Sequence, residues 1–319
     1  MDDSYLIGIR ANNHRIISRV ISRIENNREF SADFYSNLYD RSKQALRIGL
    51  TGPPGAGKST LTDQLIQHFI QQGMSVGVVA VDPTSPFTGG ALLGDRIRMN
   101  RYVWDDSVFI RSMSSGGDMG GLTRKAQEVG DVLAASGKDV IIYETVGVGQ
   151  AEHDVAKAVD VTILILVPES GDEIQLMKAG LIEIADIFVI NKSDRDGAGR
   201  LAQILKNILH TARHSDNSEP PVFNTVGNAG EGVEDLYQGI FKFIDDQKAS
   251  NQFNHKRLTH HRDRVLSIIQ DRLIRNFWTS KRLDQLALAT KNLDTVETSP
   301  QQLAQEFIGT GNEKKRKRP

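Results

Sequence analysis

We predict from the sequence an α/β protein whose central sheet is mostly parallel and covered by helices on both faces. Three observations indicate this architecture. From residue 45 to about 250, short β-branched runs alternate with longer amphipathic segments. Several short runs are apolar almost throughout, as strands buried on both faces are. The longer segments end at glycine, as helices commonly do: Ser59–Gln72 precedes Gly73, and Gly120–Ser136 precedes Gly137.

The strands are expected where an apolar run is too short to form a helix. Such runs recur along residues 45–250, so they can form the whole central sheet. In a sheet of this type, ligands bind at the carboxyl ends of the strands. The predicted strands are Leu46–Leu50, Val76–Val81, Val108–Ile110, Val140–Tyr143, Val161–Val167, Ile187–Ile190 and Val222–Phe223.

Helical extensions are expected at both ends of this domain, which we place at residues 44–250. Residues 4–30 have apolar side chains near helical spacing, which predicts one amphipathic helix within an N-terminal extension, residues 1–43. Residues 255–310 are helical in pattern but too few to form a core of their own. We therefore expect residues 251–311 to pack on the main domain or on a second copy.

The composition restricts the classes of function. Lys plus Arg number 39 and Asp plus Glu number 40, so a net charge of −1 gives no general reason to expect nucleic acid or a membrane as partner. The absence of cysteine excludes disulfides, thiolate metal sites and iron–sulfur clusters. No apolar run approaches the roughly 20 residues of a membrane helix. Acidic residues within the first thirty argue against a targeting peptide, and a cytoplasmic location is expected. The basic run at 312–319 is predicted to be a disordered tail.

A phosphate-binding loop follows the first predicted strand. Residues 52–59 fit the pattern G-x-x-x-x-G-K-[ST]. Glycines let backbone N–H groups converge on phosphate oxygens, and the following helix adds its positive amino end. Lys58 is expected to reach the β- and γ-phosphates, and the Ser59 hydroxyl to bind Mg²⁺. The motif predicts the three-layer fold of P-loop NTPases. The candidate nucleotide-binding residues here are Gly52, Pro53, Pro54, Gly55, Ala56, Gly57, Lys58, Ser59 and Thr60.

A second motif indicates which base is bound. Asn191-Lys192-Ser193-Asp194 follows the strand at 187–190 and fits N-K-x-D. The Asp194 carboxylate can accept hydrogen bonds from N1–H and the exocyclic amine of guanine, a donor pair that adenine lacks. Losing hydrogen bonds to a charged group costs about 1.5–3 kcal/mol each, which is enough to select a base. The nucleotide is therefore predicted to be GTP, bound with the help of Asn191, Lys192 and Asp194.

Two further strand ends are expected at the same edge of the sheet. Asp82 follows the strand at 76–81, and Glu144 follows the strand at 140–143. A carboxylate beside a triphosphate can hold Mg²⁺ directly or through water. Gly147, three residues after Glu144, can offer its N–H to the γ-phosphate, so its loop should respond to hydrolysis. Lys58, Asp82, Glu144 and Gly147 are the candidate catalytic residues.

Longer stretches of the chain resemble the MeaB/ArgK family of GTPases. The run from Asp82 to Met99 is similar to the first switch of that family, and the run from Glu144 to Gln150 to its second switch. Arg111-Ser112-Met113 and Gly120-Gly121-Leu122 match as well. The resemblance covers most of residues 5–300. The chain differs from the usual family pattern at Ala151, at Glu169-Ser170-Gly171 and at Asn224-Thr225-Val226-Gly227.

The resemblance implies a function and a more complete site. The family members are chaperones of adenosylcobalamin-dependent methylmalonyl-CoA mutase, and they are usually homodimers that act without binding cobalamin themselves. The implied Mg²⁺ ligands are Ser59, Asp82, Asp95 and Glu144. The late guanine loop of the family corresponds to the region of Val226. The segment called switch III, which couples the GTPase to the mutase, matches residues 171–178, with Asp172, Glu173, Gln175 and Lys178 as coupling residues.

Three other functions compete with the mutase chaperone. A GTPase for nickel or cobalt insertion usually needs a Cys/His metal relay, and this chain has no cysteine. A kinase-type ATPase of amino-acid transport conflicts with the guanine-specific tetrad. A GTP-binding scaffold without hydrolysis would be excluded by phosphate release from the purified protein.

Overall fold

The structure is a computed structural model, and it describes residues 2–82, 100–102, 104–114, 119–145, 155–168, 181–212, 219–291 and 298–312. By their contacts the chain forms two compact units, Met1–His260 and His261–Pro319. None of the helices in the described part of the chain is both long and apolar enough to cross a membrane.

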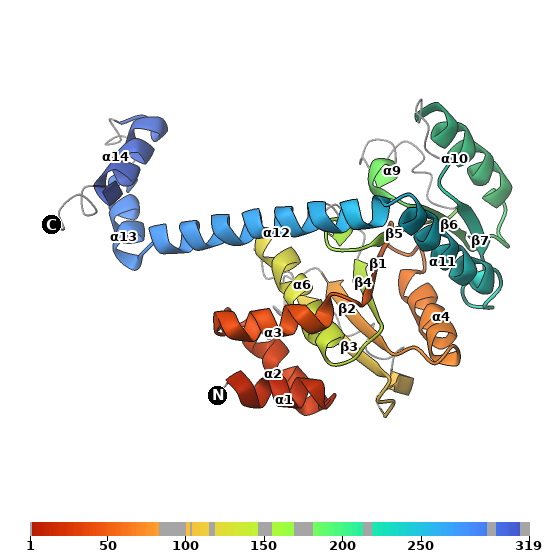
Figure 1. Cartoon of the computed structure of the whole chain (residues 1–319). Helices are drawn as coiled ribbons and strands as arrows, with labels where there is room; N and C mark the ends of the chain where they lie inside the picture. The colour runs from red at the N-terminus through yellow and green to blue at the C-terminus, as the bar shows by residue number, and fades with distance from the viewer. Residues whose placement is uncertain are drawn as a thin grey trace. The chain divides into compact units, whose positions relative to one another are not determined.

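The first unit is built around a seven-stranded sheet in the order β3-β2-β4-β1-β5-β6-β7. Every neighbouring pair is parallel, so the α/β fold with a parallel sheet is confirmed (Figure 1). Each predicted run is a strand. The strands are β1 (Leu46–Thr51), β2 (Val76–Asp82), β3 (Val108–Ser114), β4 (Val140–Thr145), β5 (Val161–Leu166), β6 (Ile187–Asn191) and β7 (Val222–Thr225).

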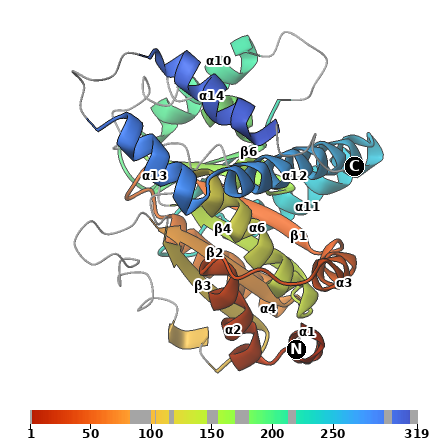
Figure 2. The same ribbon diagram turned by 90° about the vertical axis from the view of Figure 1, so that its left-hand side faces the viewer.

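Helices cover both faces of the sheet. One core cluster joins one face to α4 and α11, while the opposite face packs on α6, which carries α2 and α3 (Figure 2). Strands β4, β5 and β6 are buried at every position, which explains their continuous apolar sequences. The helices of this unit are α1 (Asp2–Arg10), α2 (His14–Glu25), α3 (Ala32–Ser42), α4 (Lys58–Gln71), the short 3-10 helix η1 (Asn100–Tyr102), α6 (Met119–Ala135), α9 (Leu181–Ile184), α10 (Ala198–Ala212) and α11 (Val233–Ala249).

The prediction of one helix over residues 4–30 is wrong, because the chain forms α1 and α2 there with a break between them. Asn12 has φ +50°, a left-handed conformation that a continuing helix does not allow. The Asn13 side chain then accepts a hydrogen bond from the Ile16 N–H at 3.1 Å and caps α2. The helical spacing of apolar residues continues across the break, so it does not show that Asn12 and Asn13 separate two helices.

The first turns of α12 (Gln252–Phe277) are fixed to the first unit by ion pairs. Arg257 forms two hydrogen bonds of 2.6 Å with the carboxylate of Asp160, whose side chain is only 4% exposed. The same guanidinium donates to the carbonyl oxygens of Lys43 and Ala45 at 2.7 and 3.0 Å. Lys256 donates to Asp186 at 2.6 Å. Two cations of α12 therefore neutralise carboxylates that stand just before β5 and β6.

The second unit contains the rest of α12, then α13 (Ser280–Ala289) and α14 (Pro300–Asn312). No residue of α12 or α13 is buried. The Trp278 ring lies 5.0 Å from Phe277 and 6.0 Å from Phe307, measured between centroids. Large apolar side chains are exposed along α12, among them Val265, Leu266, Ile269, Leu273 and Ile274.

Strand β7 is the last strand of the sheet and is only four residues long. Pro220 and Pro221 stand immediately before it. The Pro221 carbonyl accepts a hydrogen bond from the Phe188 N–H of β6 at 2.9 Å. Two consecutive residues without an N–H group therefore precede the outer edge of the sheet.

Candidate functional site

The loop between β1 and α4 has a backbone that requires glycine at two positions. Gly52 and Gly57 have φ values of +143° and +87°. A Cβ atom at Gly52 would lie 2.2 Å from the carbonyl oxygen of Ile165, and one at Gly57 would lie 2.3 Å from Nδ2 of Asn191. Space and dihedral angle thus both exclude a side chain, and the loop can bring its N–H groups close to a ligand.

Lys58 is the first residue of α4, and its ammonium group turns back over the loop. Nζ donates to the carbonyl oxygens of Gly52 at 2.8 Å and Pro53 at 3.0 Å. The residue is only 7% exposed. A fixed cation therefore lies beside the amino end of α4, where the unpaired N–H groups of the first turn carry partial positive charge. This combination favours a phosphate group.

The Glu144 carboxylate of β4 lies within hydrogen-bond distance of two hydroxyl groups of α4. The Ser59 hydroxyl donates to Oε1 of Glu144, and Oγ1 of Thr62 lies 3.0 Å from Oε2 of the same carboxylate. Thr62 also lies within hydrogen-bond distance of the Lys58 carbonyl, at 3.0 Å, and its single proton serves one acceptor at a time. Glu144 is 6% exposed. The predicted metal ligands Ser59 and Glu144 are therefore in direct contact.

The Asn191 side chain connects the phosphate loop to the loop after β7. Its Nδ2 donates to the Ala56 carbonyl at 2.8 Å. Its Oδ1 accepts from the Thr225 hydroxyl at 3.1 Å and from the Gly227 N–H at 3.0 Å. Both polar atoms of Asn191 are thus bound within the protein, and the residue holds two loops in register.

The other three tetrad residues, Lys192, Ser193 and Asp194, lie in the loop that follows β6. Lys192 has φ +56°, and the Ser193 N–H donates to the Thr225 carbonyl at 3.0 Å. Asp194 is exposed, so its carboxylate is accessible to a ligand. Val226 is buried, and its N–H donates to the Glu231 carbonyl at 3.0 Å. Hydrogen bonds thus join the tetrad loop to the buried loop at 225–227 and, through Asn191, to the phosphate loop.

The structure brings together the phosphate loop, Glu144 and the N-K-x-D loop at the carboxyl ends of β1, β4 and β6. Asp82 ends β2 and pairs with Ser114 of β3, which places its backbone at the same edge. The other predicted site residues lie outside the described residues. They are Asp95, Gly147, Asp172, Glu173, Gln175 and Lys178.

Sequence reasoning did not find three residues that complete this geometry: Thr62, Thr225 and Gly227. Thr62 follows Lys58 by four residues, so helical spacing places both on one side of α4 and could have identified it. The contacts of Thr225 and Gly227 with Asn191 join residues more than thirty positions apart. A local sequence pattern cannot predict contacts between residues so far apart.

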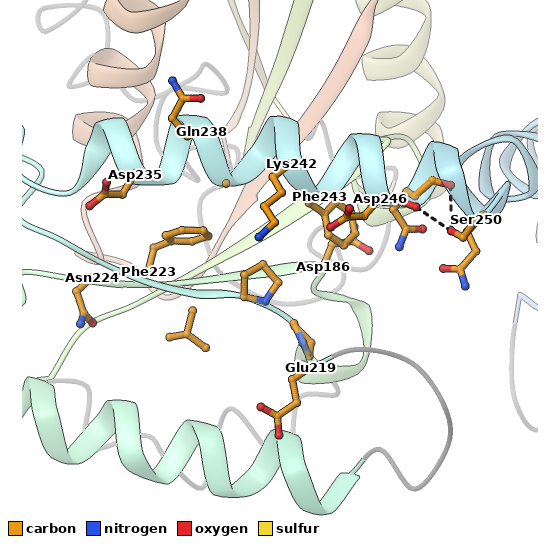
Figure 3. Close-up of a pocket in the computed structure, with 16 residues that line it drawn as sticks. Asp186, Glu219, Phe223, Asn224, Asp235, Gln238, Lys242, Phe243, Asp246 and Ser250 are labelled. Atoms are coloured by element: carbon orange, nitrogen blue, oxygen red, sulfur yellow. Dashed lines mark hydrogen bonds between the residues drawn. The ribbon is translucent and has the colours of Figure 1, made fainter.

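A pocket of about 1310 Å³ lies elsewhere in the first unit, along β7 and α11 (Figure 3). Phe223 and Asn224 of β7 and Lys242 and Phe243 of α11 are among its lining residues. None of the predicted site residues that the structure describes is among its lining residues. The hollow in Figure 3 is therefore separate from the candidate nucleotide site.

Comparison with known proteins agrees with this geometry. The sequence model of the family described as "Methylmalonyl Co-A mutase-associated GTPase MeaB" matches residues 14–282. A Pyrococcus horikoshii protein that carries the name GTPase is 43% identical over 270 residues, or 84% of this chain and 85% of that protein. The Mus musculus protein "Methylmalonic aciduria type A homolog, mitochondrial" is 37% identical over 259 residues, 80% of this chain and 62% of that protein.

A solved structure agrees in fold as well. The crystal structure of an LAO/AO transport system kinase is similar with a TM-score of 0.68 and 25% identity, covering 97% of each chain. The family match spans the phosphate loop, Glu144 and the N-K-x-D loop. The chain is therefore a P-loop GTPase and belongs to the MeaB family.

Proposed function

We propose that this chain is a GTP-hydrolysing chaperone of a cobalamin-dependent acyl-CoA mutase, either methylmalonyl-CoA mutase or a close relative. In this role GTP binding and hydrolysis control the loading of adenosylcobalamin and protect or reactivate the mutase. The family match over residues 14–282 carries the proposal, because the family is described by its association with methylmalonyl-CoA mutase. The 37% identical mouse relative, whose name refers to methylmalonic aciduria, supports it.

The phosphate end of the site supports hydrolysis by positioning and electrostatics. Lys58 stands where it can neutralise charge that develops on the γ-phosphate, and the N–H groups of the loop and of Gly147 are the proposed donors to phosphate oxygens. Ser59 and Glu144 supply oxygen donors in contact with each other, a set that suits a hard cation such as Mg²⁺. With Asp82 and Asp95 they are the proposed ligands. A bound Mg²⁺ would neutralise phosphate charge.

The coupling to the mutase is the direct test of the proposed function. We expect the purified protein to hydrolyse GTP slowly and the cognate mutase to accelerate it. Lys178→Ala or Asp172→Ala should leave GTP affinity and basal turnover nearly unchanged but lose most of the acceleration, because coupling is a free energy between two sites. Phosphate release with and without mutase measures this, and Lys206→Ala on α10 is the control. Equal acceleration in the variants and the parent would contradict the assignment of residues 171–178.

The base specificity can be tested at Asp194. Asp194→Asn should weaken GTP binding about 10- to 100-fold, since the amide oxygen can accept from only one of the two guanine donors and one charged hydrogen bond worth about 1.5–3 kcal/mol is lost. The same variant should improve binding of xanthosine triphosphate, whose 2-oxo group can accept a hydrogen bond from the new amide. Paired affinity measurements with the two nucleotides check this. Asp196→Asn, an exposed residue of the same loop, is the matched control, and ATP competing as well as GTP in the parent would contradict guanine selection.

We also propose that the protein is a homodimer and that the helices at 251–311 supply much of the contact. The exposed apolar side chains of α12 and the absence of buried residues in α12 and α13 support this. Light scattering should give twice the chain mass of 35.3 kDa. Leu266→Glu with Leu273→Glu should halve it, whereas Gln270→Glu, which adds a charge on the same helix, should not. A monomeric parent at micromolar concentration would contradict the proposal.

A further inference from the structure

A groove of about 910 Å³ on the N-terminal helices is lined by positive charge. We call it the arginine groove and define it by Arg15, Arg19, Arg23 and Arg28, with Ser18 and Ser22 between them. We infer that the arginine groove is a docking surface for an acidic helical segment of a partner protein. The inference stands on α2 and its surroundings and does not depend on the proposed mutase.

The arginines are arranged in a row by the helix that carries them. Arg15, Arg19 and Arg23 follow one another at intervals of four residues, so they share one face of α2 and rise about 6 Å from one to the next. The opposite face is buried, through Ile17, Val20, Ile21 and Ile24. Because that face is fixed in the core, α2 cannot turn the arginines elsewhere.

Three of the four guanidinium groups have no counter-ion among the residues that the structure describes. Within the described part of the chain, the side chains of Arg15, Arg19 and Arg28 make no hydrogen bond, ion pair or ring contact. Arg23 lies 4.3 Å above the Phe30 ring centroid and donates to the Glu29 carbonyl at 2.8 Å. Its Nε is buried without a partner among the described residues. The groove therefore presents charge that the fold itself does not use.

Two nearby carboxylates, those of Glu25 and Asp2, are hydrogen-bonded or ion-paired within the fold, and exposed Glu29 is adjacent to Arg28 in the sequence. Glu25, the acidic residue of α2, forms an ion pair with Arg111 of β3, and its carbonyl accepts from Lys125 of α6 at 2.9 Å. Asp2 accepts a hydrogen bond from the Ser31 N–H at 2.9 Å, which lowers the pKa of this carboxyl group. Like charges spaced four apart on a helix repel each other and destabilise it. The row of arginines therefore does not itself stabilise α2, and a bound anion would relieve the repulsion between its members.

The chemistry of the groove favours carboxylates on a helix. A guanidinium group donates in a planar fork that matches a carboxylate, and one arginine per helical turn matches acidic residues spaced four apart on a partner helix. Tyr5, the aromatic residue of the groove, lies 6.0 Å from the Arg23 guanidinium, measured to the ring centroid. The ion pair of Glu25 with Arg111 joins α2 to β3 beneath the groove.

The test uses the full-length protein and a fluorescent, capped peptide with glutamate at every fourth position in an alanine-rich helix. We expect saturable binding by anisotropy at low salt, weakened by added salt. Arg15→Ser with Arg19→Ser should weaken it at least tenfold. Arg200→Ser with Lys206→Ser, which removes two exposed cations of α10, should not change it. Thermal unfolding of both double variants checks that the fold is intact.

Four results would count against the inference. The first is no saturable binding of the peptide by the parent protein. The second is an equal loss of binding in the α10 control, because the attraction would then be general and not local. The third is tighter binding of a single-stranded oligonucleotide of equal charge that is abolished by the Arg15 and Arg19 changes. That outcome would make the groove a nucleic-acid surface. A peptide of the same composition with its glutamates clustered at one end should bind more weakly, and equal binding would argue against helical spacing.

Discussion

Lys58→Ala should reduce GTP turnover at least about 100-fold, the size of effect seen when one fixed donor to a developing anion is removed. The ammonium group of Lys58 is held over the phosphate loop by the carbonyl oxygens of Gly52 and Pro53 at 2.8 and 3.0 Å. The charge is thus held beside the loop that we expect to bind the phosphates of GTP. Phosphate release under saturating GTP measures the effect.

The fold should survive this change, because the Lys58 side chain contacts loop carbonyls and lies outside the apolar core clusters. Circular dichroism and thermal unfolding check this. Lys206→Ala, an exposed lysine on α10, serves as the matched control and should retain full turnover. If Lys58→Ala hydrolyses GTP as fast as the parent, the catalytic centre lies elsewhere in the chain.

Arg257→Ala should lower the free energy of unfolding by about 3 kcal/mol. Removing one partner of a buried ion pair costs about 3–5 kcal/mol, since the other charge stays buried without that partner. Asp160 is that charge, with a side chain only 4% exposed, while Arg257 is 32% exposed, which places the effect at the lower end. Asp160 keeps one hydrogen bond, from the Arg47 N–H at 2.9 Å. Urea unfolding monitored by circular dichroism gives the value.

Two comparisons separate the ion pair from a general effect on α12. Arg272→Ala, at an exposed position further along the same helix, should change stability little. Asp160→Asn should cost less in the Arg257→Ala background than in the parent, and the double-mutant cycle measures the coupling. Equal losses for Arg257→Ala and Arg272→Ala would refute the role of the pair.

On the same reasoning, a chain cut at residue 251 loses the cations of residues 256 and 257, whereas one ending at His260 keeps them.

The sheet and the core of the site were predictable because their signals are local. Strands such as Val161–Leu166 are buried along their whole length, so nearly every residue must be apolar, and the sequence displays that directly. The sequence of the phosphate loop also predicts its structure directly. Gly52 and Gly57 have positive φ values and no space for a Cβ atom, so the chain has to place glycine there.

The break between α1 and α2 could not be found from apolar spacing, because the core of the helical extension needs apolar residues on both sides of it. The break is caused by the left-handed conformation of Asn12 and by the Asn13 side chain, which caps α2. Each asparagine alone is only a weak sequence signal for a helix break. The contacts of Asn191 were hidden for another reason. They join three loops that meet only in the folded chain. The tetrad predicted the guanine site and gave no sign of this second role.

The two prolines before β7 have a consequence for association between copies of the chain. An outer strand exposes unpaired N–H and C=O groups to which a strand of another molecule can add, and proteins prevent this with short edge strands and prolines. Pro220 and Pro221 supply no N–H, and β7 ends after four residues. A foreign strand would find too few donors there to extend the sheet. This edge should therefore resist amyloid-like growth, and β-branched residues in place of the prolines would open it to aggregation.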